Sequence, residues 1–231
     1  MKPDLNSVIK KYGPIISRVS HRMIKDNELA KEAAQEVWFE IIKSLNSFKS
    51  NSEISTWIYT IARRTILRYS KDEKTVKSIE IDNYAALGQI EYTDAEENKK
   101  EWIMQKCDSC LTAFCHCLSN DARLIFLFRE IVGLSDMQIS DIMEMKEENV
   151  RKISSRSLKK VKNFLNDDCP LYNPEGSCRC RIRKHILSLN LDKEYNKLKS
   201  AAGLVEFYIK FDKELPRKNY WEKFISVVVT N

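Results

Sequence analysis

Residues 27–71, NELAKEAAQEVWFEIIKSLNSFKSNSEISTWIYTIARRTILRYSK, decide the fold that we expect for this chain. In the first half, apolar residues recur at the spacing of one helical face: Ala30, Ala33, Ala34, Val37, Trp38, Ile41, Ile42 and Leu45. After a polar break at 48–52, a second stripe follows: Ile54, Trp57, Ile58, Ile61, Ala62, Thr65 and Tyr69. This pattern predicts two amphipathic helices, the first with Asn27 as its N-cap.

The composition is that of a helical protein. The chain has 231 residues but only five glycines and five prolines, which disfavours an all-β fold. Its net charge of +6 permits a polyanionic partner. We expect a cytoplasmic protein with no membrane partner, because the N-terminus lacks the apolar core of a signal peptide and no apolar run reaches membrane-spanning length.

The remaining sequence predicts an all-α protein with four parts. Residues 5–25 form a further amphipathic helix, with Gly13-Pro14 as a kink site, and complete an N-terminal bundle over 1–74. Residues 75–100 form an acidic, flexible linker, since seven acids lie between Glu80 and Glu101. Residues 101–166 form a second helical domain, in which His116 points away from the buried stripe, and 167–231 form a small helical extension.

The second domain has the pattern of a helix-turn-helix. After Asn120, an N-cap candidate, a helix over 122–132 ends at Gly133. Ser135 caps a short helix, and a turn at 144–146 leads into a long helix from Glu147. Between Asn149 and Leu165 that helix carries no acid and six basic residues: Arg151, Lys152, Arg156, Lys159, Lys160 and Lys162. A basic solvated face would explain the charge alone, but the helix-turn-helix context favours DNA binding.

Two segments resemble sigma-70 family factors of the extracytoplasmic-function group. Ala30–Trp38, Phe48 and Ser55–Arg64 are similar to region 2 of that family. Similarity to region 4 rests on Gly133-Leu-Ser135, Ile139, Met145, Glu147, Val150, Arg151, Ser155 and Arg156. Glu144 replaces the usual turn glycine and Asn149 a threonine, so individual base contacts do not transfer directly.

The resemblance implies a sigma factor that binds RNA polymerase core, directs transcription initiation and performs no covalent chemistry. Core binding would fall to Glu32, Gln35 and Glu36. Recognition of the −10 strand would use Asn51, Ser52, Trp57, Tyr59, Arg63, Arg64 and Arg68, with Trp57 serving the core instead as the alternative. Recognition of the −35 element would use Glu147, Asn149, Arg151, Lys152, Ser155, Arg156 and Lys159. Promoter DNA and polymerase core are the expected partners, and an anti-sigma protein is a further candidate.

The chain has seven cysteines, several of them in the C-terminal extension. Three thiols and an imidazole there could bind zinc or copper(I): Cys169, Cys178, Cys180 and His185. The spacing C-x8-C-x-C is not a usual zinc pattern, so reduced cysteines that only pack against the helix-turn-helix are the alternative. No cofactor is required by the leading hypothesis. A helix-turn-helix regulator with metal- or redox-responsive cysteines is the rival function, and nothing in the sequence supports an enzyme.

Overall fold

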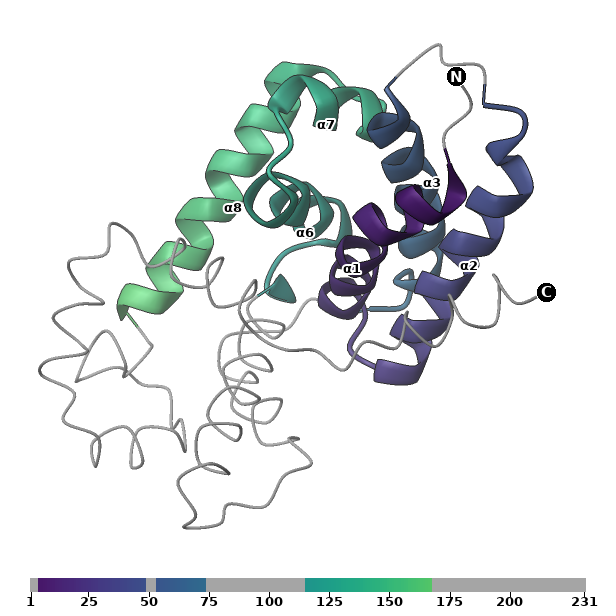
Figure 1. Ribbon diagram of the computed structural model, residues 1–231. Coiled ribbons are helices and arrows are strands. Elements are labelled where there is room, and N and C mark those ends of the chain that lie inside the picture. Colours follow the sequence, from purple (N-terminus) through teal and green to yellow (C-terminus); the bar gives the residue numbers. More distant parts are fainter. Residues whose placement is uncertain (1–3, 49–52, 74–114, 168–231) are drawn as a thin grey trace, which may run out of the picture. The chain divides into compact units, whose positions relative to one another are not determined.

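The computed structural model describes residues 4–48, 53–73 and 115–167, and every regular element among these residues is a helix, as predicted (Figure 1). None of the described helices combines the length and apolar character needed to cross a membrane. The elements in chain order are α1 (Leu5–Met23), α2 (Asn27–Leu45), α3 (Ile54–Tyr69), α6 (Asn120–Leu127), the π-helical turn η2 (Phe128–Val132), α7 (Asp136–Met143) and α8 (Glu147–Asp167).

Helix α1 begins at a side-chain cap and continues through its proline. The Asp4 carboxylate accepts a hydrogen bond from the backbone N–H of Ser7 at 2.9 Å, which satisfies one of the amides that a helix start leaves unpaired. Pro14 lies inside the helix, which remains one element from Leu5 to Met23 and ends two residues before the predicted limit. Ile9 and Ile16 are almost fully buried, so this helix forms one wall of the apolar core.

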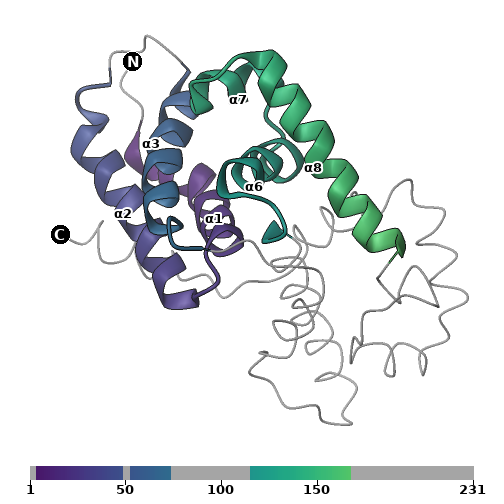
Figure 2. The ribbon, with the colours of Figure 1, turned by 180° about the vertical axis from the view of Figure 1, so that it is seen from behind.

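Helices α2 and α3 pack against each other, and α1 packs on α2, as both views show (Figures 1 and 2). Val37 and Ile41 of α2 are fully buried, in agreement with the predicted stripe. The N-cap prediction is wrong by one residue. Asp26, not Asn27, occupies the cap, and its carboxylate accepts from the backbone N–H of Leu29 at 2.8 Å.

The buried face of α3 differs from the predicted stripe. Its buried residues are Ile58, Tyr59, Ala62, Thr65 and Ile66, whereas Ile54, Trp57, Ile61 and Tyr69 keep intermediate exposure. The physical reason is that α3 contacts α6 and α7 as well as α2. A second packing partner rotates the covered surface toward Tyr59, which a stripe drawn for one partner does not include.

The helix-turn-helix elements end and begin where the sequence indicates. Gly133 closes η2 with φ +80°, a left-handed conformation that glycine adopts without strain. Ser135 and Gln138 form a reciprocal capping box at the start of α7. Glu144 ends α7 with φ 56°, so the turn keeps the left-handed geometry although a glutamate stands at this position.

The described residues divide between two compact units. The first contains α1, α2, α3, α6, η2, α7 and α8 as far as Ser154, and thereby joins segments that the sequence assigned to separate domains. Within it, the fully buried guanidinium of Arg123 in α6 donates to the carbonyl of Met23 at 2.8 Å. The second unit includes residues 115–118 and the rest of α8, where the Lys160 ammonium donates to the Cys117 carbonyl at 2.6 Å.

The start of α6 also differs from the prediction. Ser119 is the N-cap and Asn120 is the first helical residue. The side-chain amide of Asn120 instead donates to the carbonyl of Ser70 at 2.6 Å. Asn120 therefore ties the start of α6 to the C-terminal end of α3 within the first unit.

Candidate nucleic-acid interface

Helix α8 presents the predicted basic face to solvent. Its inner side is lined by Val150, Ser154, Ser157 and Val161, all buried. The cations lie on the opposite side and are exposed: Arg151, Lys152, Arg156, Lys159 and Lys160. Asn149 and Ser155, also predicted to contact the −35 element, are exposed too, and Glu147 is partly exposed. All seven residues predicted to contact the −35 element thus have accessible surface on one helix. The cations of this helix fall into two groups, those that pair with carboxylates and those that do not.

The cations near the start of α8 are paired with carboxylates one turn earlier. Arg151 donates to Glu147, and the Lys152 ammonium lies 2.5 Å from the carboxylate of Glu148. Arg156 and Lys159, by contrast, form no ion pair with any residue in the described ranges 4–48, 53–73 and 115–167. The positive charge available to a polyanion is therefore concentrated in the third and fourth turns of α8.

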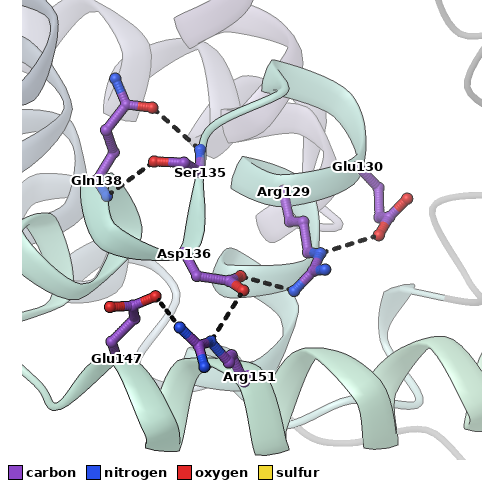
Figure 3. Close-up of polar contacts among 7 residues, drawn as sticks. All are labelled: Arg129, Glu130, Ser135, Asp136, Gln138, Glu147 and Arg151. Atoms are coloured by element: carbon purple, nitrogen blue, oxygen red, sulfur yellow. Dashed lines mark hydrogen bonds and ion pairs between the residues drawn. The ribbon is translucent and has the colours of Figure 1, made fainter.

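Arg151 also takes part in a wider cluster at the helix-turn-helix (Figure 3). Its Nε atom lies 3.7 Å from Oδ2 of Asp136, an ion-pair distance that exceeds a hydrogen bond. The other oxygen of Asp136 accepts from Nη1 of Arg129 at 2.6 Å, and Nε of Arg129 lies 3.7 Å from Glu130. The hydrogen bond to Glu147, followed by the charges of Glu147 and Asp136, raises the pKa of Arg151.

Two arginines of α3 that were predicted to contact DNA bind Glu144 in the same unit. Nη1 of Arg63 and Nη2 of Arg64 both lie 3.1 Å from one oxygen of that carboxylate. The hydrogen bonds from Arg64 and Arg63 lower the pKa of Glu144. Both guanidinium groups pair with Glu144 but differ in exposure: the Arg64 side chain is 68% exposed and the Arg63 side chain 20%, so Arg64 is the more accessible to a phosphate.

The stacking role predicted for Tyr59 is wrong in this arrangement. Its side chain is only 3% exposed, and its ring lies 5.6 Å from the ring of Phe128 and 5.8 Å from that of Tyr12. Burial, with a smaller contribution from Tyr12, raises the pKa of Tyr59. Trp57 instead keeps intermediate exposure and packs on Phe48 with the ring centroids 5.2 Å apart, so of the two predicted stacking residues it is the one with accessible surface. Asn51 and Ser52 lie outside the described residues.

The predicted polymerase-binding face of α2 is accessible. Glu32 and Gln35 are exposed, and Glu36 is partly exposed and pairs with Arg68 of α3 at 3.2 Å. The sequence interpretation missed Phe39, whose side chain is 59% exposed. Phe39 follows Glu32 by seven residues and Gln35 by four, which places it on the same helical face. That spacing is the signal from which it could have been found.

The predicted metal ligands Cys169, Cys178, Cys180 and His185 lie outside the described residues. Cys115, His116 and Cys117 are described, and all three are buried, so the prediction that His116 points away from the core is wrong. Within the described part of the chain, no group of three histidine, cysteine or acidic residues is arranged to hold a metal ion.

Comparison with known proteins agrees with the geometry. The family model of sigma-70 region 2 matches residues 8–75. The chain is 23% identical over 170 residues to the ECF RNA polymerase sigma-E factor of Haemophilus influenzae, covering 71% of this chain and 88% of that one. It is 24% identical over 147 residues to the RNA polymerase sigma factor YlaC of Bacillus subtilis, covering 62% and 80%. The sigma-E factor of Escherichia coli strain K12 is 23% identical over 164 residues, covering 68% and 84%.

Residues 8–75 thus match region 2 of the sigma-70 family. Over most of its length the chain is similar to RNA polymerase sigma factors, several of them of the extracytoplasmic-function group.

Proposed function

We propose that this sigma factor binds RNA polymerase core in the cytoplasm, directs promoter recognition with α3 and α8, and performs no covalent chemistry itself. The observation that carries the −35 assignment is the exposed basic face of α8 behind a capped helix-turn-helix. A helix in this context has the dimensions and charge to enter the major groove of DNA.

In this proposal, different residues of α8 provide general affinity for DNA and recognition of its sequence. Arg156 and Lys159 contact phosphates, because neither has a carboxylate partner among the described residues. Asn149 and Arg151 lie in the first turns, where side chains of a recognition helix reach base edges. Asparagine pairs bidentately with adenine and arginine with guanine, so these two residues supply direct readout.

The core polymerase docks on α2. Glu32 and Gln35 supply exposed polar groups, and Phe39 adds an apolar anchor on the same face. An aromatic residue surrounded by polar groups is the composition typical of an interface hot spot. Glu36 joins this face while paired with Arg68, so core binding and α3 are linked through one ion pair.

The −10 strand binds along α3 and the segment before it. Trp57 provides accessible aromatic surface for base stacking, and Arg68 an exposed cation for the backbone. The exposed Arg64 can add a backbone contact while it pairs with Glu144, whereas the more buried Arg63 joins only after releasing Glu144. An anti-sigma protein that covers these surfaces is a further partner that we propose from the similarity to sigma factors alone.

The test is transcription in vitro with purified core polymerase and a library of promoters. We expect the chain to copurify with core polymerase and to select promoters with two separated elements. Replacing Gln35 and Glu36 by alanine should lower core affinity without unfolding the chain, since both side chains lie on the polar face. Lys10→Ala, an exposed change on α1, is the matched control. A chain that binds DNA but never core polymerase would contradict the proposal and favour a helix-turn-helix regulator.

A further inference from the structure

We propose that Asp136, held by Arg129, is a positioning residue that orients Arg151 toward a G·C base pair of the −35 element. This inference rests on the proposed function, because it concerns how the recognition helix reads its site.

The three side chains come from consecutive elements of the helix-turn-helix (Figure 3). Arg129 lies in η2, Asp136 is the first residue of α7, and Arg151 lies on the second turn of α8. The capping box at Ser135 fixes the backbone next to Asp136. The Asp136 carboxylate therefore has a defined origin, and its side chain is only 20% exposed.

Both oxygens of Asp136 face guanidinium groups. Oδ1 accepts the 2.6 Å hydrogen bond from Arg129, and Oδ2 faces Nε of Arg151 at 3.7 Å. Arg129 thus fixes the carboxylate and offsets its negative charge. Without that compensation, a carboxylate beside the recognition helix would repel the phosphates of the DNA.

Asp136 does not engage the terminal nitrogens of Arg151, of which Nη2 is held by Glu147 in this structure. Asp136 contacts the Nε side, so this contact can persist while the two terminal nitrogens form the fork that matches O6 and N7 of guanine. Glu147 binds Nη2 of Arg151 from one turn earlier on the same helix. On DNA, Glu147 can instead accept from N4 of the cytosine, so both side chains favour the same base pair.

Positioning matters because arginine has a long side chain that loses much rotational freedom when it binds. A contact that orients Arg151 before DNA arrives reduces this loss and fixes the fork in register with one base pair. A purely structural role predicts something different. Exposed ion pairs contribute little to folding stability, and their removal should leave base preference unchanged.

The experiment measures binding of the reconstituted holoenzyme to DNA duplexes in which each −35 position carries each base pair. Wild type should prefer G·C at one position, and Arg151→Lys should reduce that preference roughly 5- to 100-fold while retaining the charge. Asp136→Asn should reduce preference at the same position, and the double variant should add little, because both changes remove the same oriented fork. The slope of affinity against salt should not change in Asp136→Asn.

Glu148→Gln is the matched control, since it neutralises an exposed carboxylate that pairs with Lys152 but lies outside the Arg129–Asp136–Arg151 cluster. Thermal unfolding of each variant checks that the fold is intact, and Arg129→Gln provides a second way to release Asp136 if Asp136→Asn unfolds. Unchanged G·C preference in the folded variants would overturn the positioning role and leave the sigma-factor function standing. Failure of the wild type to bind core polymerase would instead refute the proposed function.

Discussion

Replacing Arg156 and Lys159 with alanine should weaken the salt dependence of promoter binding by a predictable amount. Both residues are exposed on α8 and have no carboxylate partner in the described part of the chain. Each phosphate contact contributes about 0.9 to the slope of log affinity against log salt. The double variant should therefore lower the slope by about 1.8, which corresponds to roughly a tenfold smaller loss of affinity between about 50 and 200 mM salt.

The assay is fluorescence anisotropy of a labelled promoter duplex titrated with holoenzyme at several salt concentrations. Arg151→Ala with Lys152→Ala is the informative comparison, because each of these cations already has an acidic partner. An ion pair with no net charge releases fewer counterions on binding, so this second variant should change the slope less. Equal slopes for wild type and the Arg156/Lys159 variant, or a larger change in the Arg151/Lys152 variant, would refute the assignment of phosphate contacts.

Three further predictions concern stability and metal binding. Arg123→Met should lower the free energy of unfolding by about 2–4 kcal/mol in urea titrations, because it removes a buried charge-assisted hydrogen bond to the Met23 carbonyl; an effect no larger than that of exposed Arg156→Met would contradict it. Because the folded pKa of Glu144 is lowered, its pairs stabilise the fold above the unfolded pKa of about 4.3 and are lost as pH falls further. The melting temperatures of wild type and Glu144→Gln should therefore converge in acid, and Glu144→Gly, which suits φ 56°, should melt above Glu144→Gln. If Cys178 ligates a metal with Cys169 and Cys180, mass spectrometry should find stoichiometric zinc or copper in reduced wild type and none in Cys178→Ser; a metal-free wild type after supplementation would exclude the site.

Local signals predicted most of the element boundaries. The residues Ser135 and Gln138 have the spacing of a capping box, and Gly133 marks the end of the preceding helix, so both limits of this turn could be read from the chain. The N-caps of α2 and α6 were each misplaced by one residue. At both starts, two adjacent residues are good capping types, and the choice depends on which one adopts extended backbone angles.

Long-range packing is what the sequence could not predict. Arg22 and Arg123 are both fully buried, although arginine side chains are mostly exposed in folded proteins. Arg123 donates a hydrogen bond to the carbonyl of Met23, which lies 100 positions earlier in the chain. Tyr59 is buried for a similar reason, since Phe128 covers it. Periodicity identifies that a helix has an apolar face, but the number of helices that pack on it comes only from the tertiary structure.

The charge pattern of α8 shows how pairing changes the meaning of a basic helix. Its first turn carries Glu147 and Glu148, whose negative charges interact favourably with the positive end of the helix dipole. The same two carboxylates pair with the cations one turn later. The first two turns together therefore have little net charge. They gain little from phosphates in general and much from a base pair whose donors and acceptors match theirs. Arg156 and Lys159 have no carboxylate partner among the described residues, so a phosphate can bind them regardless of sequence. The same helix can thus supply specificity near its start and affinity further along, and the two effects can be separated by mutation.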